Sequence, residues 1–99
     1  MRICGGGIEI GNDVSIAHGV TIMATEHNFS KKEEKIRDQG VISVPVRIED
    51  DVWIGAKAVI LCGTTIRSGC VIGAGAVVTK TTEPLGVYVG VPAQRIKDR

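Results

Sequence analysis

Two histidines, His18 and His27, are the side chains of this 99-residue sequence best suited to acid–base chemistry. Neutral imidazole accepts a proton near pH 7, so either residue could act as a general base. His27 follows Glu26 at the point where a regular pattern stops, whereas His18 precedes Gly19, a combination typical of a tight corner. A corner role is favoured for His18. On position alone, a surface histidine without a chemical role is the simpler interpretation of His27.

Cysteine chemistry is not indicated. Cys4, Cys62 and Cys70 are an odd number of residues without the spacing of metal ligands, and they are interpreted as reduced thiols. Cys62 fits a corner and Cys70 a core position. No serine or cysteine nucleophile has a visible neighbouring base, so a covalent acyl-enzyme is not favoured and no metal site is expected.

Composition narrows the class of protein. The net charge of +1 gives no general reason to bind nucleic acid or an acidic membrane, and 43% hydrophobic residues argue against disorder. No apolar run reaches about 18 residues, so we expect no membrane span and a cytoplasmic protein. Only three residues are aromatic, Phe29, Trp53 and Tyr88, whereas 13 are glycine. Small aliphatic side chains must therefore build the core.

A six-residue repeat predicts the elements that position these side chains. An aliphatic residue recurs at every sixth position from Ile10 to Ile22, and again from Ile42 to Val78. A helix has a period of 3.6 and a simple strand a period of 2, so neither keeps such residues in line. A parallel β-helix does, because equivalent residues stack from coil to coil. A second, smaller column lies four positions after the first: Val14, Val20, Val46, Val52, Ala58, Thr64, Cys70 and Ala76.

Turn-forming pairs separate the two columns. Gly, Asn and Asp tolerate the positive φ that a tight corner needs, so each hexad is predicted to be a short strand followed by a corner. The aliphatic columns are interpreted as scaffold without chemistry. The corner pairs are Asn12-Asp13, His18-Gly19, Asp50-Asp51, Ala56-Lys57, Cys62-Gly63, Ser68-Gly69 and Ala74-Gly75.

The repeat is interrupted once within a single predicted domain, residues 1–99. Residues 28–41 are predicted to form a charged loop excursion, after which the ladder resumes at Ile42 with its phase moved by two residues. Loops that leave a rigid scaffold often carry function. After Val78 the repeat stops, and the tail, residues 83–99, is expected to make a strand-like return followed by a short helix or an irregular end.

The repeat resembles that of the hexapeptide-repeat acyltransferases. The resemblance is carried by Ile54-Gly55 followed by residues 72–77, Ile-Gly-Ala-Gly-Ala-Val, and by a tail, residues 90–96, similar to the family's closing Gly-x-Pro-Ala-Lys segment. It implies an all-β fold, a left-handed parallel β-helix with three hexads per triangular coil. In that geometry Ile48 stacks on Ile66, Ile54 on Ile72 and Ile60 on Val78.

Residues 26–29, Glu-His-Asn-Phe, and residues 45–56 resemble the galactoside, maltose and polysaccharide O-acetyltransferase branch. The resemblance implies that His27 is the general base, which deprotonates a sugar or glycan hydroxyl so that it attacks acetyl-CoA. The Ala56 N–H would stabilise the oxyanion and Trp53 would lie beside the thioester. Asn28 and Phe29 belong to the loop at the acceptor. Glu26 is a weaker candidate for orienting the imidazole, because adjacent strand residues point to opposite faces.

The resemblance also implies a groove for acetyl-CoA between neighbouring copies in a homotrimer. The matching positions are Ala74, Thr79, Lys80, Pro92, Arg95 and Lys97. The basic side chains among them would meet the CoA phosphates, although each is equally consistent with a solvated surface residue. Gln94 stands where a basic residue is usual in the family.

Two alternatives to an O-acetyltransferase belong to other classes. A non-catalytic or truncated β-helix scaffold is compatible with the same pattern, because enzymes of this branch are longer and carry an N-terminal cap and further coils. The metal-dependent carbonic anhydrase that shares the fold needs three histidine ligands around zinc, and this sequence has two histidines. Acceptors other than sugars, such as antibiotics and amino acids, stay open within the acetyltransferase class.

Overall fold

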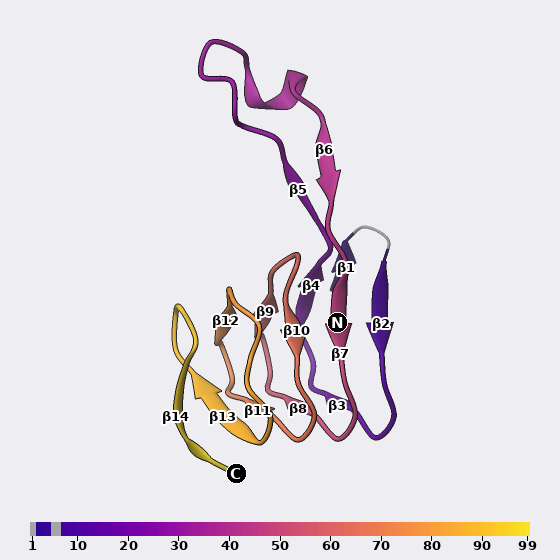
Figure 1. Cartoon of the computed structure of the whole chain (residues 1–99), viewed down its shortest axis with the longest axis vertical. Coiled ribbons are helices and arrows are strands. Elements are labelled where there is room, and N and C mark those ends of the chain that lie inside the picture. The colour runs from indigo at the N-terminus through magenta and orange to yellow at the C-terminus, as the bar shows by residue number, and fades with distance from the viewer. Residues whose placement is uncertain (1, 5–6) are drawn as a thin grey trace.

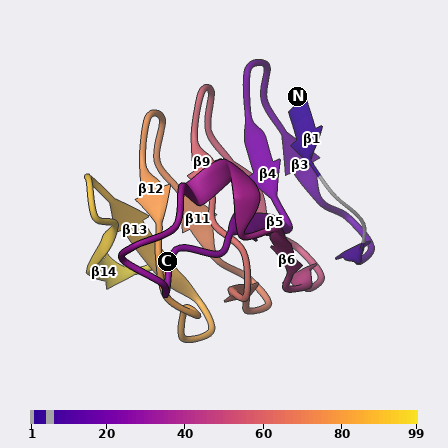
Figure 2. The same cartoon turned by 90° about the horizontal axis from the view of Figure 1, so that it is seen from above.

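The computed structural model of the chain describes residues 2–4 and 7–99. The chain winds into stacked coils whose short parallel strands form three flat faces, and one arm projects from the coils (Figure 1). Viewed from above, successive strands of a face lie side by side along the axis of the solenoid (Figure 2). The whole molecule measures 46 × 24 × 22 Å.

Each of the first three coils contributes one strand to each face. Face A contains β1 (Arg2–Cys4), β4 (Thr21–Met23), β9 (Val59–Ile60) and β12 (Val77–Val78). Face B contains β2 (Ile8–Ile10), β7 (Val46–Ile48) and β10 (Thr65–Ile66). Face C contains β3 (Ser15–Ile16), β8 (Trp53–Ile54), β11 (Val71–Ile72), β13 (Gly86–Val89) and β14 (Gln94–Asp98).

The aliphatic ladder predicted from the sequence forms the core. Ile48 pairs with Ile66, Ile54 with Ile72 and Ile60 with Val78, so the expected stacking is confirmed. These side chains are at most 1% exposed. The second column is also buried from Val20 onward, and its polar member Thr64 is satisfied because its hydroxyl donates to the Leu61 carbonyl at 2.8 Å. Burial of branched side chains on a stacked scaffold supplies the packing that aromatic residues provide elsewhere.

The corners have the backbone conformation that the sequence predicted. The second residue of every predicted corner pair has a positive φ. Three of these residues are not glycine: Asp13 at 58°, Asp51 at 56° and Lys57 at 61°. Left-handed backbone at a fixed position in each corner turns the chain by the same angle every time, so the strands of successive coils stay in register.

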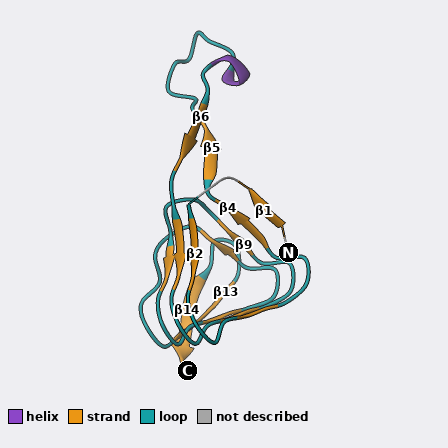
Figure 3. Cartoon of the chain, turned by 90° about the vertical axis from the view of Figure 1, so that its right-hand side faces the viewer, coloured by secondary structure: helices purple, strands orange, loops and turns teal. Residues whose placement is uncertain are grey.

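The arm is an antiparallel hairpin that leaves the solenoid between faces A and B (Figure 3). It consists of β5 (Thr25–His27), β6 (Val41–Ser43) and a connecting loop with the short 3-10 helix η1 (Ile36–Asp38). Gln39 holds the loop together: its side chain accepts from the Lys31 N–H at 3.0 Å and donates to the Lys31 and Glu34 carbonyls.

One prediction about the ladder is wrong at the arm. Ile42 was expected to restart the buried column, but it lies in β6 and is 42% exposed. The ladder restarts at Val46 and Ile48 in β7, because residues 41–43 pair with the outgoing strand of the arm instead of with a neighbouring coil. The hexad pattern cannot separate a hairpin strand from a coil strand of similar composition.

The tail also differs from expectation. After β13 the chain turns back and forms β14, which pairs antiparallel with β13, in place of a short helix or an irregular end. The connection between them covers face A, where the Val77 N–H donates to the Gly90 carbonyl at 3.1 Å and the Ala93 N–H donates to the Val77 carbonyl at 2.8 Å. A strand is favoured over a solvated helix here because it pairs the backbone groups along the edge of β13.

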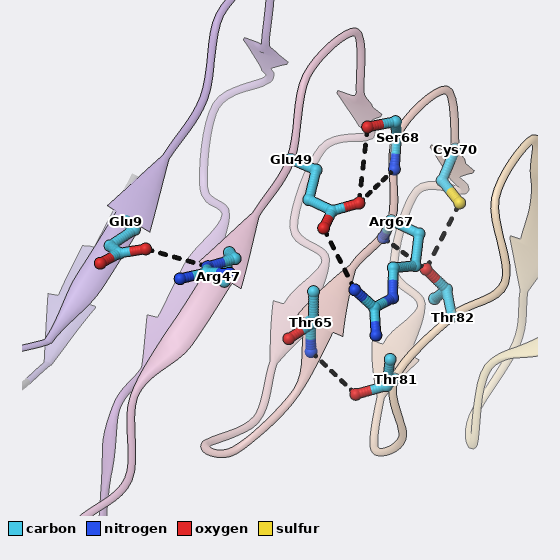
Figure 4. Close-up of polar contacts among 9 residues, drawn as sticks. All are labelled: Glu9, Arg47, Glu49, Thr65, Arg67, Ser68, Cys70, Thr81 and Thr82. Atoms are coloured by element: carbon cyan, nitrogen blue, oxygen red, sulfur yellow. Dashed lines mark hydrogen bonds and ion pairs between the residues drawn. The ribbon is translucent and has the colours of Figure 1, made fainter.

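Threonine side chains end face B. The Thr65 N–H donates to the Thr81 hydroxyl at 3.0 Å, and the Arg67 N–H donates to the buried Thr82 hydroxyl at 2.9 Å (Figure 4). In return the Thr82 N–H donates to the Thr65 carbonyl at 3.0 Å. The two hydroxyls thus replace the carbonyls of a further strand along β10.

Candidate active site

The three faces meet at three edges, and each candidate residue belongs to one of them. The arm edge, between faces A and B, carries the arm and the corner Cys62-Gly63. The alanine edge, between faces C and A, carries Ala56 and Ala74. The aspartate edge, between faces B and C, carries Asp13 and Asp51.

His27 lies at the arm edge, at the end of β5, where the arm leaves the solenoid. Its side chain is exposed and lines a cleft of about 310 Å³. The cleft is formed by the root of the arm on one side and by the corner of the next coil on the other. Its lining consists of Met23, Thr25, Glu26, His27, Val41, Leu61 and Cys62. A histidine here is held by paired backbone and is open to a small molecule.

Glu26 shares this cleft but acts on a different neighbour. Burial raises the pKa of the half-buried Cys62 thiol, and a hydrogen bond and the negative charge of Glu26 raise that pKa further. Cys62 is therefore a neutral thiol at pH 7 and not an activated nucleophile. Within the described residues, the recorded side-chain hydrogen bonds include none between Glu26 and His27, so orientation of the imidazole by Glu26 stays a prediction.

Cys70 occupies the core position expected of it. It is fully buried, and its thiol donates to the Glu83 carbonyl at 3.0 Å and lies 3.3 Å from the Thr82 hydroxyl. Cys62 and Cys70 are both free thiols. Cys4 lies outside the residues whose side chains the structure describes.

Ala56 and Ala74 occupy neighbouring corners of the alanine edge. The Gly75 N–H donates to the Ala56 carbonyl at 2.9 Å, and a Cβ added at Gly55 would lie 2.6 Å from the Ala74 nitrogen. Only a glycine allows the two corners to approach this closely. Among the hydrogen bonds of residues 7–99, none is donated by the Ala56 N–H. His18 lies at the same edge, where its carbonyl accepts from the Lys57 N–H at 3.0 Å.

Trp53 lies on the outside of face C and is 57% exposed. It pairs with Ser15 on one side and Val71 on the other, so its indole has only small or half-buried neighbours along the face. A large apolar side chain in this setting has surface available for a ligand or a second subunit.

A single copy of the chain does not bring the candidate residues together. His27 lies at the arm edge, whereas Ala56 lies at the alanine edge, on the far side of face A, and Trp53 lies on face C. The base and the oxyanion donor therefore come from different edges of the triangular solenoid. Sequence reasoning did not assign these residues to different edges, because all columns of the repeat have the same spacing and the spacing does not identify an edge.

The other candidate residues are also distributed over the scaffold. Lys80 and Thr79 are exposed and follow β12, on the side of the arm edge. Pro92 lies in the exposed connection between β13 and β14. Asn28 is half-buried in the arm and accepts from the Ser30 N–H at 3.1 Å, whereas Phe29 is 67% exposed.

Arg95 and Lys97 lie on the exposed strand β14. The Arg95 guanidinium forms an ion pair with Asp98 and donates to the Pro84 carbonyl at 3.4 Å. The Asp98 and Tyr88 side chains raise the pKa of Arg95 above its ordinary value. Arg95 is thus bound within the tail of its own chain, and a phosphate would compete with Asp98.

Sequence reasoning missed the walls of the cleft beside His27. The arm separates two coils at this edge, and four residues become neighbours only for that reason: Met23, Val41, Leu61 and Cys62. The interruption of the repeat could have predicted that Leu61 and Cys62 line the cleft. The corner of the coil that follows an excursion must lie against the root of that excursion. Within the described residues, no group of three or more His, Cys, Asp or Glu side chains is placed to hold a metal, and no helix is long and apolar enough to cross a membrane.

Comparison with known proteins agrees with this architecture. Residues 45–80 match the family model described as the hexapeptide repeat of succinyl-transferase. The galactoside O-acetyltransferase of Escherichia coli is 40% identical over 92 residues, which cover 92% of this chain and 44% of that protein.

Solved structures give the same result. A galactoside acetyltransferase in complex with coenzyme A is 41% identical with a TM-score of 0.83, and the match covers 92% of this chain and 44% of the other. A maltose O-acetyltransferase from Clostridium difficile 630 is 42% identical with a TM-score of 0.83, covering 92% and 48%. The chain spans less than half the length of each of these relatives.

The all-β fold and the repeat define a left-handed parallel β-helix of the hexapeptide-repeat type, as predicted. The resemblance of this chain to hexapeptide-repeat acyltransferases, and to the galactoside and maltose O-acetyltransferases among them, is confirmed.

Proposed function

We propose that the chain is the catalytic β-helix of an acetyl-CoA-dependent O-acetyltransferase that acts on a sugar or glycan hydroxyl. One observation carries the proposal: His27 lines a small-molecule-sized cleft at the root of the arm, on a scaffold similar to that of a protein solved with coenzyme A. Clefts of a few hundred Å³ that are lined by apolar side chains with a few polar groups are typical of small-molecule sites.

In the proposed reaction the chain transfers the acetyl group directly. The His27 imidazole takes the proton from the acceptor hydroxyl while the hydroxyl oxygen bonds to the thioester carbon of acetyl-CoA. The carbonyl oxygen becomes an oxyanion, for which the Ala56 N–H is the proposed donor. When the carbon–sulfur bond breaks, the proton passes from His27 to the CoA thiolate, and the products are the acetyl ester and CoA.

We place the complete site between two copies of the chain. Because His27 and Ala56 lie at different edges of one solenoid, the base of one copy and the oxyanion donor of another would face the same reactants. The acetyl-CoA arm would lie along the alanine edge beside Ala74, with Trp53 near the thioester and Pro92 in the tail connection. Thr79, Lys80 and Lys97 are the proposed contacts of its polar end, and Arg95 joins them only if it leaves Asp98.

Release of CoA thiol from acetyl-CoA, measured with galactosides and maltose as acceptors, tests the proposal. His27→Ala should lower the rate by about 10²–10⁴-fold, because general-base catalysis contributes that much. Glu9→Gln is the control, since it changes an exposed side chain on face B, which carries none of the proposed site residues, and it should keep the rate. If His27→Ala retains the wild-type rate, the assigned base is wrong. If no acceptor is acetylated by the wild-type chain, the scaffold alternative is favoured.

A further inference from the structure

Lys57 has a backbone conformation that is unfavourable for its residue type. It is the second residue of a corner on the alanine edge, and its φ is 61°. The other corner pairs have glycine or aspartate at this place, and aspartate tolerates the left-handed region because its short polar side chain can bond locally. A lysine there has a conformational cost that a glycine does not have. Residues strained in this way cluster at binding and catalytic sites, so the Lys57 side chain is a candidate for a role in binding.

The side chain of Lys57 extends toward the preceding coil. The Lys57 N–H donates to the His18 carbonyl at 3.0 Å, and a Cβ added at Gly19 would lie 3.1 Å from the Lys57 Cγ. The stem thus lies over the corner that contains Gly19. A Cβ added at Gly75, in the following corner, would have no atom within 4 Å, so the stem does not lie on that side. The exposed side chain therefore extends to the N-terminal side of Ala56.

The alanine edge offers this cation no acidic partner. No aspartate or glutamate belongs to its three corners, residues 17–19, 55–57 and 73–75, whereas the aspartate edge has Asp13 and Asp51 at the left-handed places. Among the ion pairs of the part of the chain that the structure describes, none includes Lys57. An exposed ammonium group without a neighbouring carboxylate attracts an anion from solution.

The direction of the Lys57 stem decides which reactant brings that anion. In the proposed function, the thioester lies at Ala56 and the phosphates of acetyl-CoA lie toward Thr79, Lys80 and Lys97, on the C-terminal side. The stem extends the opposite way, and an acetyl group carries no charge. The acceptor is the remaining reactant. Its hydroxyl must approach the thioester carbon closely, which brings the acceptor within reach of the residue next to Ala56.

We infer that Lys57 determines acceptor specificity by binding a negatively charged group, so that the preferred acceptor is a sugar that carries a carboxylate or a phosphate. The inference rests on the proposed function for the place of the thioester. The ammonium group pairs with the anion as a point charge. Because Lys57 is exposed, the gain in affinity is a few-fold and decreases with salt.

Three sugars that differ in one group serve as probes: methyl α-D-glucoside, methyl α-D-glucuronoside and α-D-glucose 1-phosphate. NMR titration measures their affinities in the presence of CoA, which occupies the groove without allowing transfer. The wild-type chain should bind the two charged sugars up to about fivefold more tightly than the neutral one, with shifts at residues 17–19 and 55–57. Salt at about 0.5 M should remove most of the difference, because it screens exposed charges. A gain for only one charged sugar identifies the group that Lys57 binds.

Four variants separate the charge of Lys57 from its backbone strain. Lys57→Gly removes both, so it should abolish the preference without lowering the temperature of thermal unfolding. Lys57→Asn is a second neutral variant, because asparagine also tolerates the left-handed region. Lys57→Arg keeps the positive charge and should keep the preference. Asp13→Gly is the matched control, since it makes the same backbone change at the aspartate edge, and it should keep the preference as well.

Equal affinities for the three sugars in wild type, or a preference that survives in both neutral variants, would overturn the inference. A KM that rises for acetyl-CoA and not for the charged sugar in Lys57→Gly would also overturn it, because the lysine would then bind the donor. Acetyl transfer to the same sugars separates the two proposals. Transfer without a charge preference contradicts the inference and keeps the function, whereas a preference in binding that depends on Lys57, without any transfer, contradicts the function and keeps the anion site.

Discussion

At the scale of single residues, the charged carboxylate of Glu49 on the outer side of face B stabilises the fold. Its carboxylate accepts from the Ser68 N–H at 3.0 Å and pairs with the Arg67 guanidinium at 3.2 Å (Figure 4). The hydrogen bond from Ser68 is the main cause that lowers the pKa of Glu49 below its ordinary value of 4.5, and Arg67 adds to it. Glu49 therefore joins two coils at the aspartate edge through the charged form of its side chain.

This predicts a specific dependence of stability on acid. Because the pKa of Glu49 is lower in the folded state, its contribution is complete above about pH 4.5 and is lost as the pH falls through the folded-state value. Glu49→Gln should be less stable than wild type at pH 7, and the difference should shrink below pH 4. Urea unfolding at several pH values measures this. Glu9→Gln, which breaks the exposed pair with Arg47, should cost little. A Glu49→Gln difference that is independent of pH contradicts the argument.

The Cys62 thiol gives a second prediction at this scale. Burial and Glu26 raise the pKa of Cys62, so alkylation by iodoacetamide at pH 8 should be slower than for a free thiol and should increase only at higher pH. Glu26→Gln removes the charge but not the burial, so it should move the pH profile partway back. Peptide mass spectrometry assigns the modification to Cys62. A profile in Glu26→Gln identical to that of wild type would show that Glu26 does not act on the thiol.

At the scale of elements, each face of the last coil has partners for its backbone groups at the C-terminal end of the solenoid. β14 covers face C, the connection before it covers face A, and two threonine hydroxyls end face B. Unpaired strand edges invite pairing with other chains, so this closure protects the last coil.

Thr82 should matter more than Thr81 for this closure. Thr82→Val preserves shape but leaves the Arg67 N–H without its buried acceptor, which should lower the free energy of unfolding by about 1–3 kcal/mol. Thr81→Val is the matched control: its hydroxyl is exposed, so water can replace it on the Thr65 N–H, and the loss should be smaller. Chemical denaturation of both variants compares them. Equal losses would mean that burial does not distinguish the two caps.

At the scale of the whole molecule, the outer sides of the faces differ in polarity. Face B carries the ion pairs Glu9–Arg47 and Glu49–Arg67, whereas face A presents Val59 and Val77 in register. A polar face is suited to water, and an apolar column is suited to a second copy of the chain. This asymmetry favours association of copies through face A, with face B left in solvent.

We expect a homotrimer with three times the chain mass of 10.5 kDa. Val59→Lys, which places a charge in the column of face A, should lower the mass measured by light scattering at micromolar concentration. Thr65→Lys places the same charge on face B and should leave the mass unchanged. A wild-type monomer would contradict both the trimer and a site shared between copies.

Much of the fold could be predicted because the repeat acts at every coil. A period of six and a turn-forming residue at the same place in each hexad allow one stacked arrangement, so the core pairs and the corners followed from sequence. Ile42 and the tail could not be predicted in the same way, because β6 and β14 pair with single neighbours that periodicity does not specify. Pairing of such strands depends on where the chain turns back.

The candidate site shows the same division. The sequence by itself determined the scaffold, the corner positions of Ala56 and Ala74, and the place of His27 at the interruption, since these depend on spacing along the chain. Only the tertiary structure decided that His27 and Ala56 lie at different edges, and that Leu61 and Cys62 line the cleft beside the histidine. The physical reason is that side chains from separate coils become neighbours through the winding of the backbone, and the arm shifts that winding at one edge alone.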